Sequence, residues 1–324
     1  MAAPACDIMG PQVTMLSRMG VLDRLRLRRP GGSRGSGPLR ASERRAGILF
    51  SLPVIVLTGA LLFLPIIQTV YYSLTEWNGI RATWIGLDNY RSLVSDPVFW
   101  RVVLNNLFLL LSIPFAILIP LLVAFLLHQH VLGWRVFRSI YFLPTAISWV
   151  VIGMVAVRVF AARGILNDLI GALGLDVRTD FLTNEYTAML AVSLTFIWSV
   201  FGTNTIIFIT GMATLDRDVY EAARVDGAGS FAIFRDITIP LLMRFIQFAF
   251  ILTLITGFTA LFSLIFVMTT GGPGYGTTTL EFFVYQKAFA QGVFGYAAAI
   301  GVVLFSIVFV ISLAQQRLLR SRED

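Results

Sequence analysis

The sequence has few charged residues for its length, and lysine, cysteine and histidine are its rarest chemically reactive residues. Charged side chains make up 13% of the 324 residues, whereas soluble domains carry about 25%. Cys6 is the only cysteine, which excludes an intrachain disulfide and a thiolate metal cluster. Lys287 is the only lysine, and it lacks the glycines of a phosphate-binding Gly-x-x-x-x-Gly-Lys loop. An ATP-driven process would therefore need its motor on a separate polypeptide.

The two histidines, His128 and His130, lie together at the end of one apolar stretch, and no carboxylate pair lies within such a stretch. We interpret them as side chains at a membrane interface rather than metal ligands. A membrane-embedded enzyme is therefore disfavoured, and we expect this chain to bind no cofactor or metal. The basic composition comes without an aromatic-interleaved basic face, so nucleic acid is not an expected partner.

Long apolar stretches dominate the rest of the chain. Each of them lacks Asp, Glu, Lys and Arg and exceeds the roughly 18 residues that indicate a transmembrane helix. They are Ala46–Thr75, Val102–Trp134, Ser139–Val157, Tyr186–Leu215, Phe245–Leu280 and Ala288–Gln316. The sequence therefore predicts an all-α membrane protein with six transmembrane helices.

The basic residues between these stretches are unevenly distributed. Lys and Arg number 18 in the two termini and the loops on their side, against 7 in the other three loops. The positive-inside rule then places both termini in the cytoplasm. Much of this contrast comes from the nine arginines of residues 1–45.

Composition also predicts the domain boundaries. Residues 1–45 are rich in Arg, Gly and Pro and are predicted to be a disordered basic cytoplasmic tail. Residues 46–316 form the predicted membrane domain, and residues 317–324 a short cytoplasmic tail. The segment 165–175 has the pattern of a short amphipathic helix at the interface.

The longest cytoplasmic loop, residues 213–244, is predicted to form two short helices that meet at a corner. Asp216 is a suitable N-cap for the first helix, and Asp218 and Glu221 have the spacing of a capping box. Ala222 and Ala223 leave a smooth surface that another protein could approach closely.

Glycine and proline define the end of this corner. Gly227 and Gly229 allow a sharp bend, and Gly227 is expected to need a backbone conformation that other residues avoid. Pro240 marks the return of the chain into the membrane.

This loop resembles the Glu-Ala-Ala loop of the permease subunits of binding-protein-dependent ABC importers. The matching residues are Glu221, Ala222, Ala223, Gly227, Ile237 and Pro240. In that family the loop docks in a cleft of the ATPase subunit and transmits its closure to the pore. The resemblance implies that these residues, with Asp226 beside them, contact a separate ATPase that uses ATP and Mg²⁺. The alternative is a plain linker in which Glu221 only caps a helix.

Resemblance extends over most of the chain from Ala46 onward. Segments 77–79, 85–90 and 96–100 are similar to the first outer loop of the sugar-type permeases, and 270–274 and 295–299 to the last outer loop of the maltose-type or glycerol-phosphate-type first permease subunit. These motifs imply a sugar or sugar-like cargo and a bacterial inner-membrane location. They also imply a homologous second permease, two ATPase subunits and an extracytoplasmic solute-binding lipoprotein.

An ion-coupled secondary transporter of small solutes is the main rival class. Such transporters usually carry ionisable residues within the membrane, and none of the six stretches contains a formal charge. The rival remains open at this point because ions can also be bound by backbone groups at broken helices.

Polar residues within the stretches are the candidates for a solute path. Thr253, Thr256, Thr259 and Ser263 fall within a sector of roughly 120° on a continuous helix. Asn204 is the most polar side chain of the fourth stretch, and Trp198 is a weaker candidate as the aromatic face of a sugar site. The alternative is hydrogen bonding between helices, which is common for Ser, Thr and Asn in membranes.

Overall fold

A computed structural model describes residues 38–128, 143–175 and 178–320. Most of the predicted tail 1–45, with Cys6, His130 and the last four residues, lies outside the described residues. The chain divides into two compact units, residues 1–61 and 62–324, which are described separately.

The first unit contains helix α1 (Pro38–Thr58) and the beginning of a π-helical turn, η1 (Gly59–Phe63). Its apolar side chains are exposed, Leu49 to 70% and Phe50 to 84%. A helix with apolar side chains on all sides is stable only in apolar surroundings.

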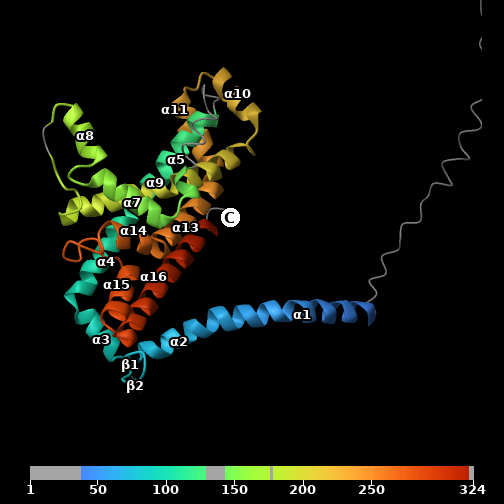
Figure 1. Ribbon diagram of the computed structural model, residues 1–324. Helices are drawn as coiled ribbons and strands as arrows, with labels where there is room; N and C mark the ends of the chain where they lie inside the picture. The colour runs from blue at the N-terminus through green and yellow to red at the C-terminus, as the bar shows by residue number, and fades with distance from the viewer. Residues whose placement is uncertain (1–37, 129–142, 176–177, 321–324) are drawn as a thin grey trace, which may run out of the picture. The chain divides into compact units, whose positions relative to one another are not determined.

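The second unit is mostly helical. Its elements, in chain order, are α2 (Leu64–Ser73), β1 (Thr75–Trp77), β2 (Ala82–Trp84), α3 (Asp88–Ser95), α4 (Pro97–Leu110), α5 (Ile113–His128), α7 (Trp149–Phe160), α8 (Ile165–Ala172), α9 (Glu185–Met212), α10 (Arg217–Val225), α11 (Ser230–Ala232), η2 (Ile233–Thr238), α12 (Ile239–Leu241), α13 (Met243–Thr259), α14 (Leu261–Met268), α15 (Leu280–Tyr285), η3 (Gln286–Ala290) and α16 (Phe294–Arg320) (Figure 1).

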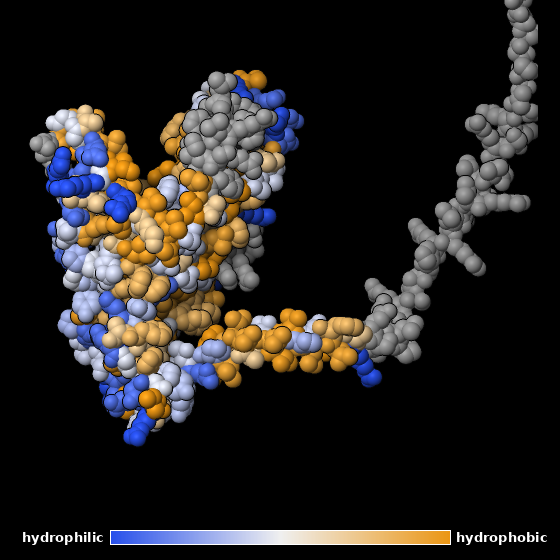
Figure 2. All heavy atoms as spheres, viewed as in Figure 1, coloured by the Kyte–Doolittle hydropathy of each residue, from blue (hydrophilic) through white to orange (hydrophobic). Residues whose placement is uncertain are grey.

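Among the described residues, five helical segments are long and apolar enough to cross a membrane. They are Arg45–Ser73, Pro97–Leu127, Trp149–Ala172, Glu185–Met212 and Phe294–Gln315. Counting the bent pair Ser230–Leu241 and Met243–Thr259 as one span raises the number to six. Apolar side chains also cover much of the outer surface of the second unit (Figure 2).

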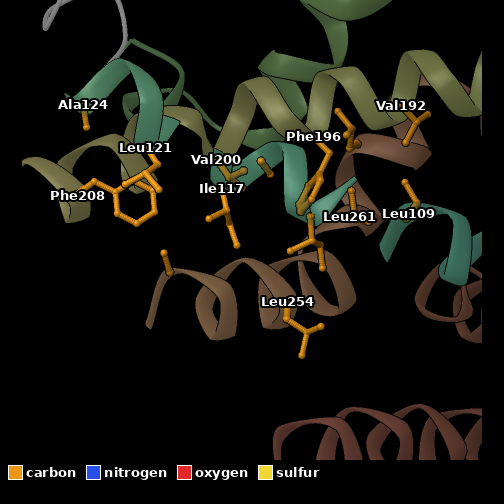
Figure 3. Close-up of a cluster of buried hydrophobic side chains, with 14 of the residues drawn as sticks. Leu109, Ile117, Leu121, Ala124, Val192, Phe196, Val200, Phe208, Leu254 and Leu261 are labelled. Atoms are coloured by element: carbon orange, nitrogen blue, oxygen red, sulfur yellow. The ribbon is translucent and has the colours of Figure 1, made fainter. Parts of the chain in front are cut away.

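The core of the second unit lies where α5 packs along α9, with α13 against both. Ala116 and Ala124 of α5 are fully buried, and such small side chains let helix backbones approach closely. Phe196 and Phe208 of α9 fill the spaces between the helices (Figure 3). This packing fixes α9 and α13, which carry most of the predicted path residues.

A two-stranded antiparallel hairpin is the one departure from the all-α prediction in the described residues. β1 pairs with β2, with Glu76 opposite Thr83. The turn is closed by the side chain of Asn78, which accepts hydrogen bonds from the backbone N–H groups of Ile80 and Arg81. Three-residue strands are too short to produce a distinct apolar alternation, which explains why the sequence predicted a loop here. We call this end of the second unit the hairpin end.

The fifth apolar stretch is broken, so the prediction of one continuous helix there was wrong. α13 ends at Thr259, Ala260 has a φ of −115°, and α14 begins at Leu261. The backbone N–H of Phe262 donates to the carboxylate of Glu281, 3.0 Å away, instead of to a carbonyl one helical turn earlier. A side chain that replaces a helical hydrogen bond is a known cause of helix breaks.

Candidate coupling elbow and solute cavity

Residues 213–244 form two helical segments that meet at a corner, as predicted; we call them the elbow. The first segment, α10, is capped by Asp216, whose carboxylate accepts from the N–H of Asp218 at 3.0 Å. Asp218 lies inside the helix, so the capping box of Asp218 and Glu221 is not formed. The N-cap prediction is confirmed and the capping-box interpretation was wrong.

The corner of the elbow is a Schellman motif centred on Gly227. The N–H of Ala228 donates to the carbonyl of Ala223 at 2.9 Å, and the N–H of Gly227 to that of Arg224 at 3.1 Å. Gly227 has a φ of +81°, the left-handed conformation that this motif requires after the helix end. The expectation of a special backbone conformation at Gly227 is confirmed.

The inner side of the elbow packs on the core. Tyr220 is buried and its hydroxyl lies 3.3 Å from the hydroxyl of Thr238, which joins α10 to η2. Phe234 is also buried, and its ring lies 5.0 Å from that of Phe125 on α5. A movement of the elbow would therefore act directly on α5 through the contact between Phe234 and Phe125.

The outer side of the elbow presents most of the predicted coupling residues. Those exposed are Glu221, Ala222, Asp226, Gly227 and Pro240, whereas Ala223 and Ile237 are half-buried against the core. Two apolar side chains beside the corner are strongly exposed, Val225 to 87% and Phe231 to 73%. Nothing in the pattern of the loop sequence distinguishes these two exposed apolar residues from the buried Phe234.

The N-cap gives a first testable prediction. Asp216→Ala removes the acceptor for the Asp218 N–H and should destabilise α10 by about 1 kcal/mol. Asp216→Asn keeps a side-chain acceptor and should be close to neutral. Hydrogen exchange of the α10 amides in the purified complex measures the difference, and equal exchange in both variants would contradict this role of Asp216.

A cavity of about 240 Å³ lies between α7, α9 and α13. Three predicted path residues, Asn204, Thr253 and Thr256, line it. The Asn204 amide donates to the carbonyl of Ala116 at 2.8 Å and lies 3.0 Å from the Thr253 hydroxyl. Asn204 is therefore both a cavity wall and a hydrogen-bonded link between α5, α9 and α13. The link agrees with the interpretation of hydrogen bonding between helices, and the role of Asn204 in a solute path stays a prediction.

The other three candidates lie elsewhere. Ser263 follows the helix break on α14, so the predicted four-residue stripe is interrupted, and Thr259 does not line the cavity. Trp198 lines a separate apolar groove with Val159 and Phe160.

Sequence reasoning missed several cavity residues. They are Thr145, Trp149, Ser199 and Thr203. Trp149 begins α7 and lines this cavity, whereas Trp198, the aromatic candidate from the sequence, does not. No helical periodicity links Trp149 to Asn204, because the two meet only through the packing of α7 on α9.

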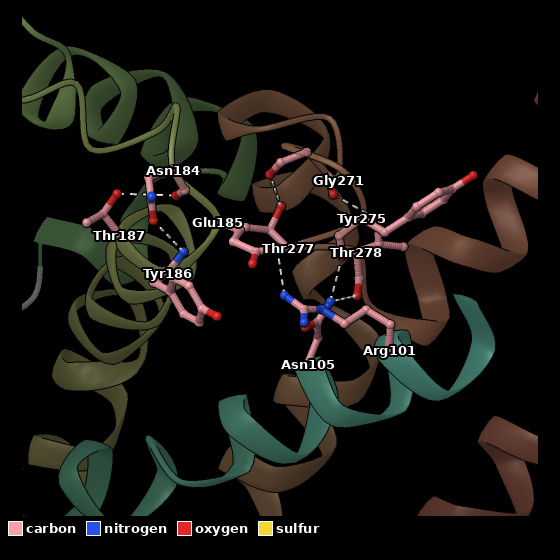
Figure 4. Close-up of polar contacts among 11 residues, drawn as sticks. Arg101, Asn105, Asn184, Glu185, Tyr186, Thr187, Gly271, Tyr275, Thr277 and Thr278 are labelled. Atoms are coloured by element: carbon pink, nitrogen blue, oxygen red, sulfur yellow. Dashed lines mark hydrogen bonds and ion pairs between the residues drawn. The ribbon is translucent and has the colours of Figure 1, made fainter. Parts of the chain in front are cut away.

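Polar side chains on α4 hold the loop 270–279 in place. Asn105 on α4 donates to the carbonyls of Tyr275 at 2.7 Å and Thr278 at 2.9 Å. One turn earlier, Arg101 forms a 2.7 Å ion pair with Glu185 at the start of α9 (Figure 4). The loop is thereby fastened to α4, and α4 to α9.

These two contacts are expected to differ in strength. Asn105 is buried, so Asn105→Leu leaves two loop carbonyls without their hydrogen-bond donor. The substitution should lower the free energy of unfolding by about 2 kcal/mol or more. Arg101→Met breaks a half-exposed pair and should cost less than about 1 kcal/mol. Thermal unfolding of the purified complex compares them, and an equal or reversed order would contradict this account.

Comparison with known proteins assigns the chain to a class, the membrane permeases of transport systems. Residues 82–323 match the family described as "Binding-protein-dependent transport system inner membrane component", and the chain belongs to that family. This membership excludes the alternative class, an ion-coupled secondary transporter.

Comparisons with individual proteins support the same assignment. A probable ABC transporter permease of Pyrococcus horikoshii is 35% identical over 82% of this chain and 92% of its own. The lactose transport system permease protein LacF of Rhizobium radiobacter is 31% identical over 86% and 95%. The fold is that of a bacterial alginate ABC transporter solved in complex with an alginate pentasaccharide-bound periplasmic protein (TM-score 0.76, 23% identity, 88% and 98% covered). The chain is a permease subunit of an importer.

Proposed function

We propose that this permease carries a sugar or sugar-like solute into the cell through the cavity at Asn204. The observation that supports this most directly is the lining of that cavity, where an amide and several hydroxyls lie near the half-buried ring of Trp149. Such a lining suits a sugar, since hydroxyls need hydrogen-bonding partners while the C–H face of the ring packs on an aromatic surface. Similarity to a lactose permease supports the same cargo class.

The rest of the proposed assembly follows the family. A homologous second permease completes the pore, two ATPase subunits supply ATP hydrolysis, and an extracytoplasmic lipoprotein delivers the solute. We place the protein in a bacterial inner membrane with both termini and the elbow in the cytoplasm, as the arginine distribution favours. The hairpin end then faces the binding protein.

The elbow is the proposed contact with the ATPase. Its exposed Val225 and Phe231 are unfavourable in water unless a partner covers them, and the small Ala222 beside Glu221 leaves room for one. Asp218 and Asp226 add negative charge that would meet a basic rim on the ATPase cleft. Movement of the ATPase would pass through Phe234 to Phe125 on α5, whose Ala116 carbonyl is bonded to Asn204.

The cargo assignment is tested by a matched pair of substitutions on α13. Thr256 lines the cavity and Thr259 does not, yet each hydroxyl bonds to the carbonyl four residues earlier. Thr256→Val removes a hydroxyl from the path and should raise the apparent KM for uptake about two- to tenfold, the effect of one lost hydrogen bond. Thr259→Val should leave it unchanged.

Uptake is measured in a deletion strain complemented with each variant, using a radiolabelled sugar whose uptake depends on this chain. Sugar affinity of the isolated binding protein serves as the reference for delivery. Identical kinetics in Thr256→Val and the unmodified protein would remove this cavity from the solute path.

A further inference from the structure

Glu281 belongs neither to the elbow nor to the lining of the cavity at Asn204, so neither feature explains its position. It lies on α15, is partly buried, and its Oε2 accepts from the Phe262 N–H at the break between α13 and α14. Within the described part of the chain, this is the only hydrogen bond recorded for its carboxylate, and no basic side chain pairs with it. A helix break needs only an acceptor, which a neutral amide would supply without the cost of burying a charge.

The surroundings of Glu281 are aromatic. The Phe262 ring lies 5.0 Å from that of Tyr285 and 5.7 Å from that of Phe266. Phe266 is 43% exposed, so this cluster presents an open apolar face next to the carboxylate. Burial raises the pKa of Glu281 to about 7, against the smaller opposing effect of the Phe262 N–H. Near neutral pH the group therefore both accepts and donates hydrogen bonds.

The cluster lies directly beyond the cavity on the same segment of chain. Thr256 lines the cavity, its carbonyl accepts from the N–H of Ala260 at the break, and Phe262 follows two residues later. The break therefore lies about one helical turn from the cavity wall along α13.

We propose that Glu281, with the rings of Phe262, Phe266 and Tyr285, forms a second solute site at the helix break, which takes neutral or amino sugars and rejects sugars that carry a carboxylate. The proposal rests on the sugar-import function proposed above. The free carboxylate oxygen would bind sugar hydroxyls or an ammonium group, and the exposed ring face would pack on the sugar ring. In its ionised form, the unpaired Glu281 carboxylate repels the carboxylate of an acidic sugar strongly, which gives the site its charge preference.

Protection from chemical modification tests this site without knowledge of the natural cargo. Dicyclohexylcarbodiimide modifies protonated carboxyls in apolar surroundings, and peptide mass spectrometry measures its addition to Glu281. The complete importer complex in lipid nanodiscs is treated with this reagent in the presence of glucose, glucosamine or glucuronate at equal concentration. Glucose and glucosamine should slow modification of Glu281 roughly threefold or more once their concentration reaches about twice the Kd, because protection follows occupancy of the site, whereas glucuronate should not.

Two variants complete the test. Phe266→Leu keeps the carboxylate and its Phe262 contact but removes the exposed ring, so protection by glucose should weaken. Glu281→Gln keeps an acceptor for the Phe262 N–H and should raise the KM for a neutral sugar, while Glu76→Gln in the exposed part of β1 should not.

Equal protection by all three sugars, or by none, would overturn the proposed site, as would failure of Glu281→Gln to assemble into the complex. If sugar uptake depends on this chain while Glu281 is unprotected, only this site is wrong. If no sugar uptake depends on the chain, the proposed function itself fails.

Discussion

Replacement of Gly227 by valine is expected to lower ATP-driven uptake by about tenfold or more while the membrane helices remain inserted. The φ of +81° costs a residue with a side chain roughly 1–2 kcal/mol, and a β-branched one more. A Cβ at Gly227 would have no atom within 4 Å, so the effect comes from the backbone and not from a clash. The Schellman corner should reopen, and ATP hydrolysis should become uncoupled from transport.

Two controls isolate this cause. Gly227→Asn should retain most of the uptake, because asparagine tolerates the left-handed conformation better than other side chains. Gly229→Ala should be neutral, since Gly229 has a φ of −72° and open space around it. Uptake and ATPase activity are measured together in proteoliposomes. Normal coupled uptake by Gly227→Val would reduce the elbow to a plain linker.

Replacement of Gly295 by alanine should lower the stability of the protein strongly. A Cβ at this position, near the start of α16, would collide with the carbonyl oxygen of Thr75 and come within 3.0 Å of the Trp77 nitrogen. Both atoms belong to the backbone of β1, so no side chain can turn away. We expect a loss of about 1–3 kcal/mol, visible as a lower melting temperature and less protein in the membrane.

Gly301 on the same helix provides the matched control. A Cβ there would meet only the Thr69 methyl group at 3.9 Å, an ordinary van der Waals contact. Gly301→Ala should therefore be neutral or stabilising by up to about 1 kcal/mol, because alanine favours helix more than glycine does. If the two alanine variants unfold at the same temperature, the close approach of α16 to the hairpin does not contribute to the stability of the protein.

Local features of this protein could be predicted from the sequence. The apolar stretches, the Asp216 cap and the glycine corner depend on residues close together in the chain, and the structure contains them. The sequence indicated Asn204 as a candidate because a polar amide is conspicuous in an apolar helix, and the structure places it in the wall of a cavity.

Features made by distant residues could not be predicted in this way. The break at Ala260 depends on a carboxylate at position 281, and the cavity brings Trp149 to Asn204 from another helix. Helical periodicity describes one helix at a time, so it placed Ser263 in line with Thr253 across a break that it could not detect.

In the proposed solute cavity, the hydrogen bonds of Asn204 limit the substitutions by which engineering could change the cargo. Its amide bonds to Ala116 on α5 and lies against Thr253 on α13, so a new side chain there alters the packing of three helices at once. The hydroxyls of Ser199 and Thr256 instead bond to carbonyls of their own helices while they line the cavity. Libraries that vary these two positions and keep Asn204 should therefore yield altered specificity with far fewer misfolded variants.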